Sequence, residues 1–250
     1  MITNSFSSES INFLINKDII FCDVDNTVCE SCCEISRGIA TTMNSINKTF
    51  IFISGTDFTE LKRMLPLRFP HFLLPNSGAE VYFFNGDKYI KYYTVEFKNK
   101  PKVISVIEKA IKKFKLIPET PDQILDRGSQ ITLSCIGRTA PKVLKDKWDK
   151  DLKKRKPIAK FISKELCKDG FTITIGGTTS VDVGIGKKVG LDKFINYMNI
   201  DTDRTIYIGD KLSKDGNDYP ASFIMDCVSV ESPSDFSSLL LLSYICSFMK

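Results

Sequence analysis

Three short apolar runs along the chain end abruptly in polar residues. They occupy residues 17–27, 48–56 and 204–210, with the sequences KDIIFCDVDNT, KTFIFISGT and RTIYIGD. Runs of this kind are typical of strands that are buried on both faces of a sheet. Helical patterns follow the first two runs, over residues 35–46 and 57–65. This alternation of strand and helix predicts an α/β fold with a parallel sheet.

The polar residues after these strands mark the place where we expect an active site. In open α/β sheets, ligands bind just beyond the carboxyl ends of the strands. The three runs end in DVDNT, SGT and GD, which supply carboxylates, a hydroxyl and flexible glycine.

The middle of the chain has a mixed pattern without such polar strand ends. The Asn85-Gly86 pair between two aromatic runs is a strong hairpin signal. Helical and alternating periodicities mark the rest of the segment. The pattern predicts one hairpin, two helices and two strands, over residues 81–93, 101–115, 150–166, 129–136 and 171–175.

We therefore predict a second domain inserted into the first. Residues 1–93 and 187–250 form the α/β core, and residues 94–186 form an inserted α+β domain. The apolar residues 239–242 are bracketed by serines and predict a final packing helix.

The composition agrees with a soluble globular protein. The chain has 250 residues, of which 42% are hydrophobic and 26% charged. No stretch approaches the ~20 apolar residues that are needed to cross a bilayer. The start, MITNSFSSES, lacks the basic residues and the apolar run of a signal peptide. We expect a cytoplasmic protein with no membrane partner.

Positive charge is concentrated in the inserted segment. Between residues 98 and 168, Lys and Arg outnumber Asp and Glu by 20 to 8, whereas the whole chain carries a net charge of +5. Solvated helix faces are one explanation, and a domain that attracts an anionic substrate is another. A nucleic-acid-binding module is a third hypothesis. The segment lacks the interleaved aromatic residues of a single-strand-binding surface, so we expect no nucleic-acid partner.

Cysteine and histidine are expected to contribute little chemistry. Cys29, Cys32 and Cys33 form a local cluster, but a zinc site would need a fourth ligand, and the single histidine, His71, is far away in the sequence. Partly buried thiols in a loop are the simpler interpretation. His71 lies among apolar residues and is expected to be structural, so that acid–base work falls to carboxylates and lysines.

Asp23 and Asp25 follow the first strand, two residues apart. Side chains at this spacing share one face of a strand, so both carboxylates can reach one ligand. Such a pair can bind a hard cation through oxygen. Alternatively, one carboxylate can attack a substrate while the other handles protons. A solvated acidic loop is the other interpretation of a lone DxD pair.

Further polar groups follow the other strands. Asp210 closes the third strand, and residues 215–218, with the sequence DGND, add oxygen ligands. Ser54 begins a loop that leads into a helix. Its hydroxyl and the backbone N–H groups of the loop can bind a phosphate there. A lysine can balance phosphate and carboxylate charge, and three candidates follow the inserted segment: Lys187, Lys188 and Lys193.

DVDNT, SGT, a lysine and GDKLSKDGND, in this order on strand tips, resemble the motifs of the haloacid dehalogenase (HAD) superfamily of phosphotransferases. The resemblance covers the whole core. The insert resembles the α/β cap of the subfamily that acts on sugar phosphates and similar small molecules. A Rossmann-like core with a parallel sheet and an inserted cap is the implied fold.

The similarity extends to the eukaryotic-type phosphomannomutases and spans nearly the whole chain. The segments that resemble theirs are SGTDFTELKRML, PNSGAEVY, DRGSQITLSCIGR, GGTTSVDV, GLDK and IYIGDKLSKDGND. Two of these segments lie in the cap, beyond what a more general relative would share.

This resemblance implies a role for each matched residue. Asp23 is the nucleophile that becomes an aspartyl phosphate, and Asp25 is the general acid and base. Ser54 and Lys193 hold the transferring phosphate, with Lys187 and Lys188 as alternatives because the loop from Asp182 to Asp192 is longer than in those mutases. The implied Mg²⁺ ligands are Asp23, the backbone carbonyl of Asp25, and Asp210, supported by Asn217 and Asp218. The implied contacts to the sugar phosphate in the cap are Arg127, Arg138, Lys145, Ser180 and Asp182.

Three departures from the mutase pattern bear on the reaction. Asn26 stands where the mutases usually have glycine, and residues 28–36 lack the arginine that they place near Cys32. Lys145 replaces a cap arginine, which keeps the charge but loses the fork that binds phosphate in a bidentate way. The aspartyl-phosphate chemistry is unaffected by these changes.

The predicted function is Mg²⁺-dependent phosphoryl transfer on hexose phosphates. We favour interconversion of mannose 1-phosphate and mannose 6-phosphate. If water reaches the aspartyl phosphate first, the enzyme is a sugar-phosphate phosphatase instead. The resemblance also implies a homodimer formed through the cap.

Overall fold

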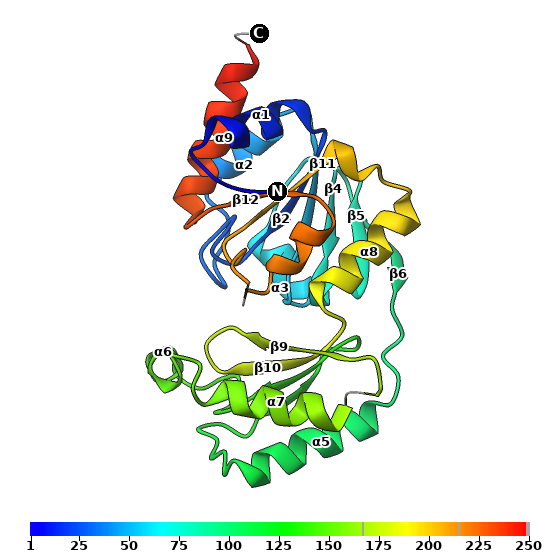
Figure 1. Ribbon diagram of the computed structural model, residues 1–250, viewed down its shortest axis with the longest axis vertical. Coiled ribbons are helices and arrows are strands. Elements are labelled where there is room, and N and C mark those ends of the chain that lie inside the picture. The colour runs from blue at the N-terminus through cyan, green and yellow to red at the C-terminus, as the bar shows by residue number, and fades with distance from the viewer. Residues whose placement is uncertain (167, 215, 249–250) are drawn as a thin grey trace. The chain divides into compact units, whose positions relative to one another are not determined.

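The computed structural model describes residues 1–166, 168–214 and 216–248. The chain divides into two compact units, Met1–Tyr93 with Lys187–Lys250, and Thr94–Gly186. The colours of Figure 1 show the same division, because the blue start and the red end of the chain belong to one unit. The second unit is thus an insertion into the first.

The first unit is built on a mostly parallel sheet. Its described strands lie in the order β1, β12, β11, β2, β3, β4, β5 and β6. The pairs from β1 to β4 are parallel, and β5 runs antiparallel to β4. The predicted α/β fold is confirmed. The bounds are β1 (Ile2–Asn4), β2 (Ile19–Asp23), β3 (Thr49–Ile53), β4 (His71–Leu74), β5 (Glu80–Phe84), β6 (Tyr89–Thr94), β11 (Thr205–Gly209) and β12 (Asp226–Ser229).

Side chains of the central strands alternate between two hydrophobic cores. Phe21 and Tyr207 lie in one core, whereas Cys22 and Ile208 lie in the other. This alternation follows from the two-residue period of a strand, and burial on both faces explains the continuous apolar runs in the sequence.

Helices cover both faces of this sheet (Figure 1). The core that holds Cys22 also receives side chains from α1 (Ser8–Asn16), α2 (Arg37–Ser45), α3 (Phe58–Met64) and α9 (Pro233–Ser247). The core that holds Tyr207 receives them from α8 (Lys187–Met198) and the 3₁₀ helix η2 (Tyr219–Phe223). Side chains that accept backbone N–H groups begin four of these helices. These capping residues are Ser7, Ser36, Asp57 and Ser232.

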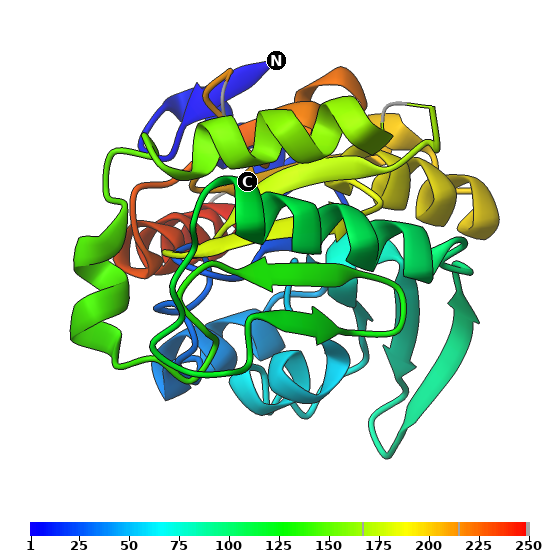
Figure 2. The same cartoon turned by 90° about the horizontal axis from the view of Figure 1, so that it is seen from below.

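The second unit has an antiparallel sheet in the order β7, β8, β10, β9. Helices α5 and α7 pack against each other and against this sheet, and Figure 2 shows them side by side. Apolar residues of both helices and of the strands form a separate core. The bounds are β7 (Ile124–Asp126), β8 (Ile131–Ser134), β9 (Thr172–Gly176), β10 (Ser180–Gly184), α5 (Lys100–Lys113), α6 (Lys142–Trp148) and α7 (Arg155–Leu166).

Local differences from the sequence prediction have physical causes. The Asn85-Gly86 hairpin is present, and Gly86 has the positive φ of 99° that its turn requires. The helix expected over residues 150–166 begins only at Arg155, because the carboxylate of Asp149 accepts the backbone N–H of Lys154 and of Arg155. The pattern did not predict α8. In the described part of the chain, no helix is both long and apolar enough to span a bilayer.

Candidate active site

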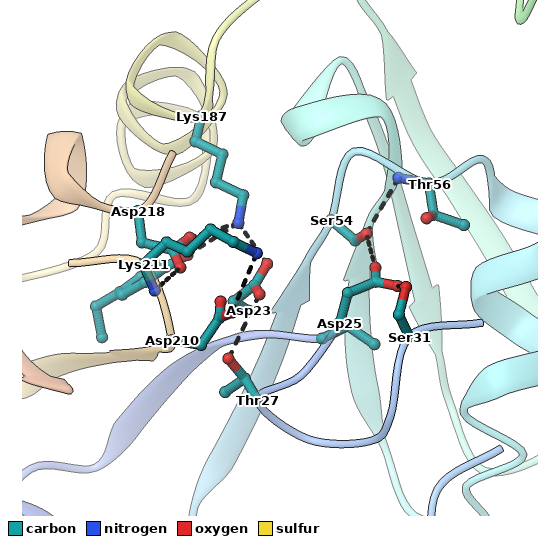
Figure 3. Close-up of polar contacts among 12 residues, drawn as sticks. Asp23, Asp25, Thr27, Ser31, Ser54, Thr56, Lys187, Asp210, Lys211 and Asp218 are labelled. Carbon is teal, nitrogen blue, oxygen red and sulfur yellow. Dashed lines mark hydrogen bonds and ion pairs between the residues drawn. The ribbon is translucent and has the colours of Figure 1, made fainter. Parts of the chain in front are cut away.

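The carboxyl ends of three neighbouring strands bring the first candidate residues together. Asp23 is the last residue of β2 and lies opposite Ile53, the last residue of β3. Ser54 therefore begins the loop beside Asp23. On the other side of β2, Gly209 ends β11, and Asp210 follows it. The register of the parallel strands thus converts three separate sequence motifs into one site (Figure 3).

Three carboxylates form a cluster at this edge of the sheet. Oxygen atoms of Asp23, Asp210 and Asp218 all lie within 4.8 Å of one another. Asp23 is 4% exposed and Asp218 is fully buried. Their main counter-charge is Lys187, whose Nζ donates to Asp23 Oδ1 and, at 2.5 Å, to Asp218 Oδ1. The exposed Lys211 pairs with Asp210 Oδ2 at 3.1 Å.

Electrostatics of the cluster show an excess of negative charge. Burial, together with the charges of Asp218 and Asp210, raises the pKa of Asp23 to about 8, although Lys187 acts to lower it. Burial alone would lower the pKa of Lys187, but Asp218 and Asp23 hold it above its usual value. The lysine is therefore a fixed cation. Lys187 and Lys211 together do not offset three ionised carboxylates, so further positive charge is needed to keep Asp23 ionised at neutral pH.

This cluster fits a divalent metal ion. Asp210 Oδ1 is buried and has no hydrogen-bond partner among the described residues. An unpaired buried carboxylate oxygen is costly unless a cation compensates it. Oxygen donors are also the ligands that Mg²⁺ prefers. Asp210 Oδ1 is thus available to hold such an ion. Asp23 Oδ2, which accepts the Thr27 hydroxyl at 3.4 Å, is the weaker-bonded oxygen of Asp23 that could join it.

Asp218 differs from Asp210 because both of its oxygens already have partners. Oδ1 accepts hydrogen bonds from Lys187 and, at 2.7 Å, from the Tyr207 hydroxyl. Oδ2 accepts the backbone N–H of Lys211 at 3.1 Å. Asp218 is therefore placed to anchor the lysine. Its neighbour Asn217 is exposed, and Asp215 lies outside the described residues.

Asp25 points away from this cluster, toward Ser31 and Ser54 (Figure 3). Its Oδ2 accepts the Ser54 hydroxyl at 3.1 Å, and its Oδ1 accepts the Ser31 hydroxyl at 2.9 Å and the backbone N–H of Cys32 at 3.3 Å. The carboxylate is thus oriented by three donors while remaining half-buried. Asn26 has a φ of 62°, a left-handed conformation that asparagine tolerates better than most residues.

A left-handed turn supports the Ser54 loop. Residues 76–78, which follow β4 and Pro75, all have positive φ angles. The backbone N–H of Ser77 donates to Ser54 O at 2.7 Å, and that of Asn76 donates to Thr56 O at 2.9 Å. Two successive non-glycine residues in this conformation are strained, which is characteristic of functional sites. No pattern in the sequence predicted this support.

Of the three candidate lysines, Lys187 reaches the cluster and Lys193 does not. Lys193 is exposed on α8, and Lys188 is exposed and pairs with Asp192 at 2.7 Å. The helix geometry explains this, because six residues at ~100° each place Lys193 on a different face from Lys187. Of the three alternatives, Lys187 is thus the one that lies at the carboxylate cluster, and it takes the place of Lys193 in the proposal below.

The candidates in the second unit form two local groups. Asp182 Oδ1 accepts the Thr132 hydroxyl at 2.6 Å; burial raises the pKa of Asp182, and the charge of Arg127 acts to lower it. Ser180 lies two residues before Asp182 on the same strand, and so on the same face. In the other group, Lys145 Nζ donates to the backbone carbonyl of Arg138.

A buried arginine that the sequence analysis missed holds the turn before Ser180. Arg155 donates to the carbonyl oxygens of Gly176 and Gly177, both at 2.9 Å, and to Asp149 Oδ2 at 2.9 Å. The turn between β9 and β10 is thereby tied to the start of α7. In the sequence this residue is one of many basic residues, and no local signal distinguishes it.

Residues 83–241, more than half of the chain, match the model of the eukaryotic phosphomannomutase family. The chain belongs to this family. The resemblance seen in the sequence is thereby confirmed, and the match includes the whole inserted unit. No curated protein matches the chain in sequence.

Two solved structures illustrate the fold that this phosphomannomutase-family chain shares with other proteins. The IMP-nucleotidase of Plasmodium falciparum matches with a TM-score of 0.71 and 16% identity, over 96% of this chain and 72% of that chain. A haloacid dehalogenase-like hydrolase from Bacteroides thetaiotaomicron matches with a TM-score of 0.60 and 16% identity, over 92% and 99%. At these identities the likeness concerns the fold alone.

Family and fold together define the class of the protein. It is an enzyme of the haloacid dehalogenase type, a phosphotransferase or phosphatase that acts on a small-molecule phosphate. The acidic cluster at the strand ends is where a divalent metal can bind.

Proposed function

We propose that the enzyme transfers a phosphoryl group through Asp23, with Mg²⁺ as the cofactor and a hexose phosphate as the substrate. The observation that carries this proposal is the pairing of buried Asp23 with Lys187, beside the unpaired oxygen of Asp210. A nucleophilic carboxylate needs nearby positive charge to accept an anionic phosphate. In the proposal, Asp23, Asp210 and the backbone carbonyl of Asp25 hold the ion, with Asn217 and Asp218 in support.

Each residue has one task in the proposed reaction. Bound Mg²⁺ supplies positive charge that offsets the charge of the phosphate. Asp23 attacks the phosphorus atom and becomes an aspartyl phosphate, while Lys187 and Ser54 bind the phosphoryl oxygens. Asp25 begins the step protonated, gives its proton to the leaving oxygen and is left as a carboxylate. The Ser54 hydroxyl, which donates to Asp25 in this structure, turns to donate to the phosphoryl oxygen during the transfer. In the reverse step the same carboxylate removes the proton from the attacking hydroxyl.

The second unit is proposed to bind the sugar phosphate. Arg127 and Arg138 suit the phosphate, because a guanidinium binds phosphate in a bidentate way. Lys145 adds charge next to Arg138. Ser180 and Asp182 offer polar groups on one strand face for sugar hydroxyls.

We favour a phosphomannomutase-like reaction, because the family match includes the inserted unit. In such a reaction the sugar takes the phosphoryl group back on its other oxygen. A phosphatase is the second candidate, and two observations favour it. The fold is shared with an IMP-nucleotidase and a hydrolase, and the loop of residues 28–36 lacks an arginine.

An isomerisation assay distinguishes the two reactions. Mannose 1-phosphate is incubated with Mg²⁺ and a trace of glucose 1,6-bisphosphate, and mannose 6-phosphate and inorganic phosphate are followed together. Asp23→Asn is the blank, and IMP serves as a second substrate. Faster formation of mannose 6-phosphate than of inorganic phosphate supports the mutase reaction. Formation of inorganic phosphate alone supports the phosphatase reaction. Equal activity of Asp23→Asn and the wild type would remove Asp23 as the nucleophile.

A further inference from the structure

Tyr207 is a buried polar residue beneath the active site that the proposed chemistry does not use. It lies in the middle of β11 and is fully buried in the core that α8 covers. Phenylalanine would fill this apolar position equally well. Burying a hydroxyl there costs free energy of folding unless it is hydrogen-bonded. The hydrogen-bond partners of the hydroxyl therefore indicate the role of this tyrosine.

The Tyr207 hydroxyl lies between the lysine and its anchor. It donates to Asp218 Oδ1 at 2.7 Å, and Lys187 Nζ lies 3.4 Å from the hydroxyl oxygen, within hydrogen-bond reach. Lys187 also donates to Asp218 Oδ1 itself. Tyrosine, lysine and aspartate thus form a closed triangle, and Lys187 extends from it to Asp23.

The triangle restrains a side chain that is otherwise flexible. A lysine has four rotatable carbon–carbon bonds and binds as a point charge, so its position depends on the partners that surround it. Asp218 alone could rotate and carry the ammonium group with it. A second donor on Oδ1, together with the Lys211 N–H on Oδ2, fixes the carboxylate at both oxygens.

We propose that Tyr207 is a positioning residue that, through Asp218, sets the place of Lys187 against the phosphoryl group on Asp23. This inference rests on the proposed function of Asp23 and Lys187. Tyr207 itself touches neither the phosphate nor the sugar. Its loss is therefore expected to slow phosphoryl transfer while leaving sugar binding unchanged.

The test is Tyr207→Phe, which removes one oxygen atom and keeps the ring. Tyr93→Phe is the matched control, because the Tyr93 hydroxyl is buried too but has no hydrogen-bond partner among the described residues. We expect kcat of Tyr207→Phe to fall about tenfold with KM within about twofold, on the order of one lost hydrogen bond to a charged group. Tyr93→Phe should stay within about twofold in both constants.

A binding measurement separates positioning from a structural role. Beryllium fluoride with Mg²⁺ forms an analogue of phosphate on a carboxylate, and calorimetry gives its affinity without any sugar. We expect Tyr207→Phe to bind it about tenfold more weakly than the wild type. In a Lys187→Met background the same substitution should have no further effect, because residues that act through one another are not additive.

The outcomes distinguish this inference from the proposed function. If Tyr207→Phe binds beryllium fluoride like the wild type, or weakens it equally in the Lys187→Met background, the inference is wrong and the proposed function stands. If the wild type binds no beryllium fluoride in the presence of Mg²⁺, both are wrong. The choice of sugar does not enter the measurement.

Discussion

Single residues decide the charge of the site. Asp23, Asp210 and Asp218 bring three carboxylates together, and Lys187 is the buried cation that faces two of them. Removing one partner of a buried ion pair leaves an uncompensated charge, which typically costs about 3–5 kcal/mol. Lys187 therefore serves both the stability of the site and the proposed phosphoryl transfer.

Substitution of the two lysines tests this assignment. Lys187→Met should lower kcat by about 10²–10³-fold, the size of effect seen when a group that stabilises transition-state charge is removed. Lys193→Met should stay within about twofold, because Lys193 is exposed on α8. Steady-state kinetics with Mg²⁺ measure both, and circular dichroism verifies folding. A large loss in Lys193→Met with an active Lys187→Met would reverse the assignment.

His71 makes stability depend on pH. It is fully buried in β4, where its ring nitrogens lie 2.7 Å from Phe69 O and 3.0 Å from the Tyr89 hydroxyl, a structural role. Burial lowers the pKa of His71 from 6.5 to about 4. Between these values the unfolded chain binds more protons than the folded one. The stabilisation is thus fully present above pH ~6.5 and is lost as the pH falls toward ~4.

Urea unfolding at pH 7, 6, 5 and 4.5 measures this dependence. The contribution of His71 to the free energy of unfolding should decrease by about 3 kcal/mol between pH ~6.5 and ~4, because each unit of pKa shift corresponds to about 1.36 kcal/mol. His71→Phe is the control, since carboxylates also titrate near pH 4. A wild type and a His71→Phe variant with the same pH dependence would disprove the role of His71.

At the scale of elements, one close contact places two active-site segments together. A Cβ atom on Gly190 of α8 would lie 1.9 Å from Ser77 O, and one on Gly78 would lie 2.8 Å from the Gly190 Cα. The helix that begins with Lys187 thus touches, backbone to backbone, the left-handed turn that supports Ser54. Only glycine permits this approach.

Gly190→Ala should therefore disturb Lys187 and Ser54 at once. The methyl group has no space, so α8 or the turn must move by about 1 Å, and displacements of this size can lower activity by about 10²-fold. Overpacking should also lower the free energy of unfolding by about 1–3 kcal/mol. Gly38→Ala in α2, where the nearest atom is 4.0 Å away, is the control; it should leave the kinetics unchanged and should not lower the free energy of unfolding. Wild-type kinetics in Gly190→Ala would contradict the argument.

At the scale of the whole molecule, two units with separate cores carry the two parts of the proposed task. The carboxylate cluster lies in the unit of Met1–Tyr93 and Lys187–Lys250, and the sugar-binding candidates lie in Thr94–Gly186. Lys187 is the first residue after the inserted unit. Each unit has its own hydrophobic core and can unfold in its own transition.

Mg²⁺ should therefore stabilise one unit selectively. An ion that binds only the folded state adds about 2.7 kcal/mol when its concentration is 100 times Kd. We expect calorimetry to show one unfolding transition that rises with Mg²⁺ and falls with a chelator, while the other stays constant. Asp210→Asn should abolish the shift. A shift that survives Asp210→Asn would place the ion elsewhere.

The sequence allowed the fold class and part of the site to be predicted. The apolar runs that end in Asp23, Ser54 and Asp210 were sufficient, because parallel strands bring their carboxyl ends to one edge of a sheet. The predicted hairpin and the last helix, now part of α9, were local patterns as well. Fold and family are confirmed. The roles of the individual residues and the choice between mutase and phosphatase remain predictions.

Only the tertiary structure decided which side chains contact partners that are distant in the sequence. Lys187 reaches Asp23 across 164 residues, and which face of α8 it occupies depends on where that helix begins and how Gly190 docks it. Tyr207 looks like any apolar residue of a buried strand until Asp218 lies against its hydroxyl. The sequence by itself determined which chemistry lies at the strand ends, because strand periodicity is local. Only the packing of distant segments decided which lysine, tyrosine and glycine hold that chemistry in place.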